Sequence, residues 1–276
     1  MISKLVRFEA RSTFRLLVIV WAALLAMAII IGGLALITHG GFYQDLLQGS
    51  KAVYVIDKIV STLMWILYGA LFVAQIVLTL AIVVLRFYRG MLGDEGYLMH
   101  TLPVKTGDLI TSKGIVATVA IIGSIIIGTL SILIMVFSIE PDGLRYVMYG
   151  FKTALQEEPL IPLYIVEGLI VLVISILSAV YQIYASMSVG QLLNRYRVLM
   201  SLAVYIGIGM VLSTVGTVLG VLAGSTDLGI WLGDLMNKRV LGPQMIFLGM
   251  FLTSAIPLVA FHIMTEKLLS RRLNLL

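Results

Sequence analysis

Apolar residues gather in six long segments of the chain, and shorter polar segments separate them. The apolar segments cover about residues 16–38, 59–85, 114–139, 162–187, 198–223 and 243–265. Each is long enough for the roughly 20 residues that a membrane-spanning helix needs. The fourth is expected to begin at Pro162, because proline suits the first turn of a helix. The pattern predicts an all-α polytopic membrane protein, with six transmembrane helices in a single domain over residues 1–276.

The composition supports a membrane location. Hydrophobic residues make up 60% of the chain and charged residues 12%, with a mean hydropathy of +1.08, whereas soluble domains contain roughly 25% charged residues. Cysteine is absent, which excludes disulfides and thiolate chemistry. Because His39, His100 and His262 lie far apart in sequence, no metal site or catalytic residue is expected. The first apolar segment is too long for a signal peptide, so it is expected to stay in the mature protein.

The distribution of basic residues predicts the orientation of the spans. If both termini are cytoplasmic, the inner segments hold 13 of the 19 basic residues, and the outer segments hold eight acidic residues against the remaining six basic ones. Both termini, the loop 86–113 and the tail 266–276 are therefore expected inside the cell. The net charge of +5 is a topology signal and does not indicate nucleic acid. The outer segment 139–161 is longer than a tight turn and is interpreted as a lid or a substrate-facing element.

Residues 1–15 are predicted to form an amphipathic helix. Lys4, Arg7, Arg11 and Arg15 recur every three or four residues and share one helical face. The opposite face is mixed and includes Glu9. Two interpretations remain open: the basic residues stop the first span at the lipid headgroups, or the helix lies along the inner leaflet.

The fourth span carries a polar stripe, formed by Glu167, Ser175, Ser178, Gln182 and Ser186. The helical period of about 100° per residue places these residues near one face, which should point toward protein or water. An ionisable group at membrane depth is a functional candidate by default. Helix packing is favoured over transport chemistry, because Glu167 lies close enough to the helix start to reach outer water.

The fifth span carries a ridge of small residues, formed by Gly209, Ser213, Gly216, Gly220 and Gly224. Such a ridge allows two helix backbones to approach closely in lipid. It is expected either to form the seam of a dimer or to pack two helices of one subunit.

Motifs for nucleotide binding and common hydrolytic chemistry are missing from the sequence. There is no Gly-x-x-x-x-Gly-Lys-Ser/Thr loop, Gly-x-Ser-x-Gly elbow or His-Glu-x-x-His motif. No enzymatic activity is therefore expected of this chain. If energy drives the protein, it comes from another chain or from an ion gradient.

The loop between the second and third spans has a specific sequence with helix-start signals at Pro103, Thr106 and Asp108. Its segment "DEGYLMHTLPVKTGDLITSKG" resembles a pattern in permease subunits of bacterial type-2 ATP-binding-cassette exporters, particularly those of Gram-positive bacteria. The later segment "SVGQLLNRYRVL" is similar to the turn between their fourth and fifth spans. The positions that match the loop pattern are Asp94, Glu95, Gly96, Tyr97, Leu98, Thr101, Leu102, Pro103, Val104, Ser112 and Lys113.

The resemblance implies a function and a set of partners. In such permeases this loop forms a coupling helix that docks on a separate cytoplasmic ATPase subunit, which binds ATP and Mg. A second permease subunit, identical or related, completes the transporter in the bacterial cytoplasmic membrane, with peptides, drugs or lipids as possible cargo. Two alternatives remain: a membrane scaffold or accessory protein without transport, and a polytopic enzyme that uses Glu167.

Overall fold

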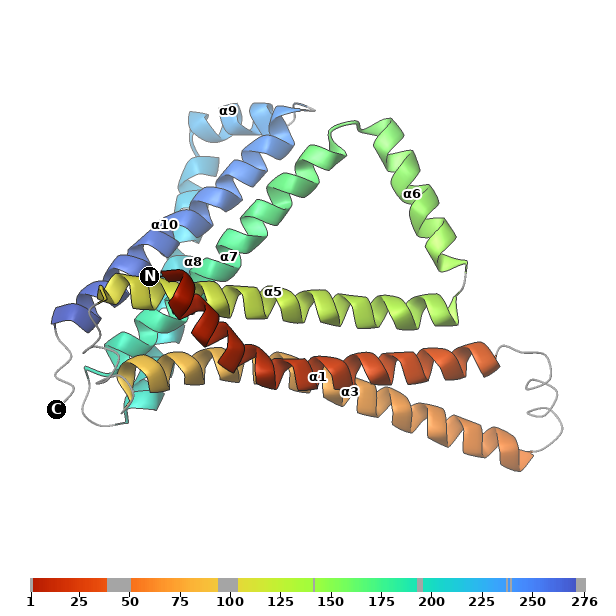
Figure 1. The fold of residues 1–276 in the computed structure, drawn as a ribbon. Helices are drawn as coiled ribbons and strands as arrows, with labels where there is room; N and C mark the ends of the chain where they lie inside the picture. Colours follow the sequence, from red (N-terminus) through yellow and green to blue (C-terminus); the bar gives the residue numbers. More distant parts are fainter. Residues whose placement is uncertain are drawn as a thin grey trace. The chain divides into compact units, whose positions relative to one another are not determined.

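The computed structural model describes residues 2–38, 51–93, 104–140, 142–192, 196–236, 238 and 240–271. Within these ranges all regular secondary structure is helical (Figure 1). The elements are α1 (Ile2–Thr38), α3 (Lys51–Phe87), the π-helix η1 (Tyr88–Leu92), α5 (Thr106–Ile139), α6 (Gly143–Glu157), α7 (Ile161–Gly190), α8 (Arg197–Gly224), α9 (Asp227–Met236) and α10 (Leu241–Arg271).

Six of these helical segments are long and apolar enough to cross a membrane. They are α1, α3 continued by η1, α5, α7, α8 and α10, and their most apolar windows have mean hydropathies from 2.0 to 2.7. The predicted all-α fold with six candidate spans is therefore confirmed at the level of helix length and composition. Helix α7 begins at Ile161 and has Pro162 in its first turn, the place where proline suits a helix.

Several helices extend further than the apolar pattern predicts. Helix α5 begins at Thr106 rather than at residue 114, so Ser112 and Lys113 lie inside this helix. Helix α10 continues to Arg271, beyond the expected end of its span at residue 265. The basic segment 1–15 is continuous with the first span in α1. Adding a residue to an existing helix gains one backbone hydrogen bond without a new nucleation cost, so these helices continue past their apolar windows.

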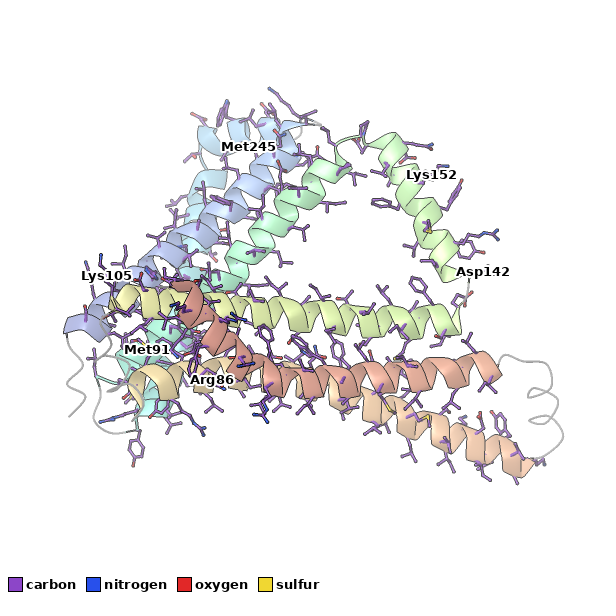
Figure 2. All side chains as sticks on the ribbon, viewed as in Figure 1. Arg86, Met91, Lys105, Asp142, Lys152 and Met245 are labelled. Atoms are coloured by element: carbon purple, nitrogen blue, oxygen red, sulfur yellow. The ribbon has the colours of Figure 1, made fainter. Side chains whose placement is uncertain are left out.

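Two further helices lie in segments that the sequence analysis left without assigned structure. One is α9; the other is α6, where Leu144, Val147, Met148 and Phe151 recur at helical spacing and no residue is buried. Figure 2 shows side chains standing off α6, including that of Lys152 on its polar side. An amphipathic pattern of this kind is typical of helices at a boundary between apolar and aqueous surroundings. The lid and the substrate-facing interpretations both remain predictions.

The contacts within the chain define two compact units. Unit 1 contains Met1–Glu9, Val84–Thr118 and Leu160–Leu276, and unit 2 contains Ala10–Val83 and Val119–Pro159. In unit 1, α7 and α10 lie side by side along most of their length (Figure 1). In unit 2, a buried core joins α1, α3 and α5 and consists of Leu24, Ala28, Ile31, Tyr68 and Met135. The single-domain organisation stays a prediction.

The turn between α7 and α8 in unit 1 depends on a close backbone approach. A Cβ atom added at Gly190 would lie 2.7 Å from the backbone nitrogen of Ser201 and 2.8 Å from its Cα. Because backbone atoms cannot move aside cheaply, only glycine fits here. Tyr196, which precedes α8, adopts the left-handed conformation with φ of 59°, which is uncommon outside glycine.

Candidate functional site

The candidate coupling loop is described in part, at its two ends. Val104, Ser112 and Lys113 lie in the described chain, with Val104 just before α5 and the other two inside it. The remaining candidate residues lie outside the described residues, namely Asp94, Glu95, Gly96, Tyr97, Leu98, Thr101, Leu102 and Pro103. The geometry of the site therefore concerns the segments that hold the two ends of this loop: η1 with Gly93 on one side and the first turns of α5 on the other.

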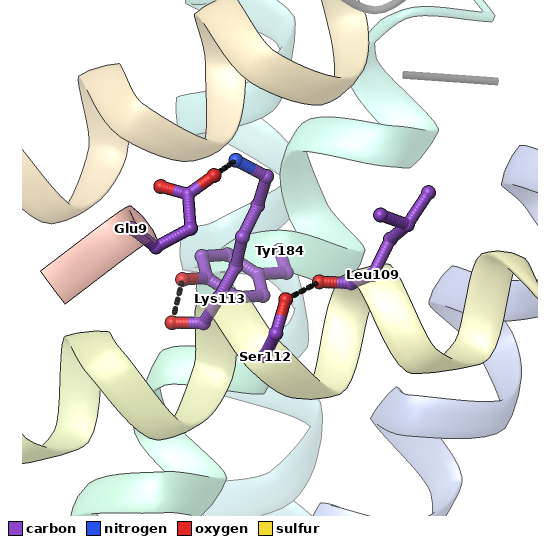
Figure 3. Close-up of polar contacts among 5 residues, drawn as sticks. All are labelled: Glu9, Leu109, Ser112, Lys113 and Tyr184. Atoms are coloured by element: carbon purple, nitrogen blue, oxygen red, sulfur yellow. Dashed lines mark hydrogen bonds and ion pairs between the residues drawn. The ribbon is translucent and has the colours of Figure 1, made fainter. Parts of the chain in front are cut away.

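An ion pair between α1 and α5 lies at the centre of the site. The ammonium Nζ of Lys113 donates a hydrogen bond to Oε1 of Glu9 at 2.5 Å (Figure 3). Both residues are buried, with exposed fractions of 5% for Lys113 and 7% for Glu9. The basic residues of the same helical segment, including Lys4 and Arg11, are exposed. The amphipathic helix therefore turns its single acidic residue inward and its cations outward.

Gly90 in η1 makes room for the charged end of Lys113. A Cβ atom at this position would lie 2.5 Å from Nζ of Lys113, closer than such atoms approach in folded proteins. Gly90 is itself buried, together with Met91 and Leu92. A π-helical turn is often found at functional positions of a longer helix, and here it brings the end of the second span against Lys113.

Tyr184 connects α7 to the same point. Its hydroxyl donates a hydrogen bond to the backbone oxygen of Lys113 at 3.3 Å. Its ring stacks on that of Phe87, the last residue of α3, with centroids 3.9 Å apart and an angle of 9° between the planes. Both rings are almost completely buried. Lys113 is thus held by groups from α1, α5, η1 and α7, all within unit 1.

Ser112 and its neighbours have a packing role. Ser112 is 1% exposed, and its hydroxyl donates to the backbone oxygen of Leu109 within the same helix, at 2.8 Å (Figure 3). Leu109 and Ile110 are buried as well. The face of α5 that carries Leu109, Ile110 and Ser112 therefore packs against protein.

The electrostatics of the Glu9–Lys113 pair favour a positioning role over a stabilising one. Removing two charges from water is costly, so a buried ion pair contributes little net stability compared with apolar residues of the same size. Its geometry is specific, however, because each buried charge is stabilised only when its partner is present. The pair therefore fixes the register of α1 against α5. Among the described residues, no group of three or more His, Cys, Asp or Glu side chains is placed to hold a metal ion.

Part of the polar stripe of α7 is buried against neighbouring helices in unit 1. Ser178 and Ser186 are buried, and the hydroxyl of Ser175 is 2.8 Å from that of Ser254 on α10. Gln182 lies beside Gly209 of α8, with its Nε2 3.9 Å from the position of a Cβ there. The carboxylate oxygen Oε2 of Glu167 is buried and accepts no hydrogen bond from any described residue.

The small residues of the α8 ridge have different surroundings at the two ends of the ridge. Gly209 faces Gln182, but a Cβ atom added at Gly216, Gly220 or Gly224 would meet no described atom within 4 Å. Ser213 is exposed. No described residue fills the space beside the last three glycines, and the dimer seam and the packing of two helices of one subunit both stay predictions.

Comparison with known proteins gives no relative for this chain: no family, no curated protein and no solved structure matches it.

The sequence analysis missed the residues that position Lys113. Glu9 was noted only as part of a mixed helical face, although it is the single acidic residue among the first 44 of the chain. An isolated acid in a basic segment is a usable signal for a charge partner. Gly90 and Tyr184 give no comparable signal, because their role depends on the distance between separate helices.

Proposed function

We propose that this chain is the permease subunit of an ATP-driven type-2 exporter in a bacterial cytoplasmic membrane. A separate ATPase subunit binds ATP and Mg and docks on the loop that contains Asp94–Pro103, and a second permease completes the transporter. Two six-span halves then move a peptide, drug or lipid-like cargo by alternating access. The resemblance of Asp94–Gly114 to exporter permeases and the six candidate spans support this function.

The observation that carries the proposal is the fixation of both loop ends at Lys113. A loop that transmits movement from an ATPase to spanning helices needs rigid ends, because a flexible attachment would absorb the movement. Here η1 provides one end through Gly90, and α5 provides the other through Lys113. The ion pair to Glu9 ties α1 to the same point. A movement of the loop would therefore be transmitted to η1, α5 and α1 together.

Co-purification with an ATPase tests this function. The tagged permease is expressed with the ATPase subunit encoded beside it, extracted in mild detergent and reconstituted in lipid nanodiscs. We expect the two chains to purify together, and we expect the permease to change the rate of ATP hydrolysis. A membrane scaffold that binds the ATPase without changing its rate, or a chain that recovers no ATPase, would contradict the proposal.

A further inference from the structure

Helix α6 carries an apolar stripe along most of its length. Its apolar side chains fall within one arc of about 120° around the helix axis, at the helical period of about 100° per residue. Val147, Met148 and Phe151 are 61%, 65% and 51% exposed, and no residue of the helix is buried. The described chain therefore leaves the stripe largely uncovered. It consists of Leu144, Val147, Met148, Phe151, Ala154 and Leu155.

The opposite side of α6 is polar. Arg145 and Lys152 are exposed and lie two turns apart along the same border of the stripe. Tyr149, Thr153 and Gln156 follow in the arc beyond them. Long basic side chains at such a border keep their apolar stems against lipid while their charges reach water or the headgroups. This distribution of side chains is typical of a helix that lies in the plane of a membrane surface.

The chain connects α6 to a candidate span at each end. Helix α5 ends at Ile139 and α7 begins at Ile161, and both are long and apolar enough to cross a membrane. The 15 residues of α6 extend over only about 22 Å, against roughly 30 Å for the hydrocarbon core. A segment that joins two consecutive spans and does not cross the membrane itself begins and ends on the same face. Both ends of α6 therefore belong to one face of the membrane.

Short connections keep α6 close to that face. Three residues separate it from each neighbouring helix, and an extended chain of this length covers roughly 10–14 Å, less than the length of α6. On the α5 side the backbone nitrogen of Gly143 donates to the oxygen of Glu140 at 2.9 Å, which makes a tight turn. The adjoining turns of both spans suit lipid, since Val136 of α5 and Val166 of α7 are 46% and 53% exposed. The helix therefore cannot stand upright away from the bilayer.

We propose that α6 is an interfacial helix, whose apolar stripe is immersed in the surface of the lipid bilayer between the third and fourth spans. Lipid covers the stripe, and the polar side faces the headgroups and water. In the expected orientation this is the outer face of the membrane. The proposal requires that α5 and α7 span the membrane, and it does not depend on the exporter function.

Spin labels attached to single cysteines test the proposal on the full-length chain in phosphatidylcholine nanodiscs. The native chain has no cysteine, and each side chain to be replaced is exposed. Collisions of the label with oxygen, which dissolves in lipid, and with neutral nickel ethylenediamine diacetate, which dissolves in water, report its surroundings. The labelled positions are 144, 147, 148 and 151 on the stripe and 145, 149, 152 and 156 on the polar side.

We expect the two collision rates to vary along α6 with the helical period and in opposite phase. Oxygen collisions should be most frequent at positions 147, 148 and 151, and nickel collisions at positions 149, 152 and 156. Labels at positions 147 and 151 should lie about 5–10 Å below the headgroups, the depth of an interfacial helix. Ile126 of α5, which is 59% exposed, is the control for a lipid-facing position.

Two matched substitutions test whether the stripe itself holds α6 in the bilayer. Phe151→Asp replaces an aromatic ring on the stripe by a charge, and Tyr149→Asp does the same on the polar side. The label stays at position 147, one turn before position 151. Phe151→Asp should increase its collisions with nickel, whereas Tyr149→Asp should leave them unchanged. Equal nickel collision rates in the two variants would contradict the proposal.

The scan itself has two further outcomes that would overturn the proposal. Low rates for both reagents along the stripe would show that protein covers it, either a second permease or another part of this chain. High nickel rates on both sides would show that α6 stands in water, as a lid does. Because eight positions are scanned, the pattern survives the loss of one variant that fails to elute as a single gel-filtration peak. Absence of ATPase binding or transport would leave the result unchanged.

Discussion

Lys113 is the residue on which the candidate site depends, and its ion pair gives the first prediction. Glu9→Gln or Lys113→Met leaves one buried charge without a partner and should lower the free energy of unfolding by about 3–5 kcal/mol. The double variant Glu9→Leu/Lys113→Met removes both charges and should recover most of this loss. Thermal unfolding in detergent, followed by tryptophan fluorescence, measures the difference.

The control for this prediction is Glu266→Gln. Glu266 is partly exposed and lies 4.0 Å from His262, a separation at which an ion pair contributes little. It should shift stability by less than about 1 kcal/mol. If Glu9→Gln and Lys113→Met also changed the free energy of unfolding by less than about 1 kcal/mol, the ion pair would not be buried as described.

Gly90 gives a second prediction at the residue scale, which concerns whether Gly90→Ala raises or lowers the stability of the protein. Replacing glycine by alanine inside a helix usually stabilises it by roughly 0.5–1 kcal/mol. Gly69→Ala, which adds a Cβ in open space, should show this gain. Gly90→Ala places the Cβ against Nζ of Lys113 and should destabilise the protein instead. Parallel thermal unfolding of the two variants checks the opposite signs, and a gain at Gly90 would contradict the close approach.

The loop between the second and third spans is the element that the exporter function needs most. Changing Asp94 and Glu95 to lysine should weaken ATPase binding in a salt-dependent way, because rim charges steer and orient a partner. Tyr97→Ala or Leu102→Ala should weaken it at any salt concentration, by about 1–3 kcal/mol if either is a hot spot. The measurement is the ATPase recovered per permease at low and at high salt. Full binding by all these variants would exclude the loop as the coupling element.

Helix α8 gives a second prediction at the element scale. Because no described residue fills the space beside Gly220, we expect a second permease to pack there. Gly220→Leu should reduce dimer recovery in mild detergent, since a bulky side chain separates backbones that small residues bring together. Gly207→Leu is the matched control: Gly207 is also in open space, but on the opposite face of the same helix. Equal dimer recovery from both variants would show that the ridge does not form the dimer contact.

The orientation of the whole molecule gives the last prediction. The charge asymmetry places the loop at residue 100 inside the cell and residue 142 outside. The native chain has no cysteine, so cysteines introduced singly at these positions are clean probes. In intact cells an impermeant thiol reagent should label position 142 and spare position 100. The reverse pattern would show that the topology is inverted, so that the loop lies outside the cell and cannot contact a cytoplasmic ATPase.

The helices were largely predictable because their signal is local. A spanning helix must be apolar over its own length, whatever surrounds it, so the six spans and the start of α7 at Ile161 follow from the sequence. The helix ends were less predictable. Past the apolar window, continuation to Thr106 in α5 and to Arg271 in α10 depends on hydrogen bonds that charged residues can also make.

The sequence by itself determined the class of the protein: an all-helical chain with six apolar segments, basic residues concentrated in alternate polar segments, and no nucleotide-binding motif. Only the tertiary structure decided which residues meet. The pairing of Glu9 with Lys113 across more than 100 residues, and the stacking of Phe87 on Tyr184, depend on distances between helices. Helical periodicity fixes the face of the helix on which a side chain lies. Which residues that face contacts depends on how the helices pack together.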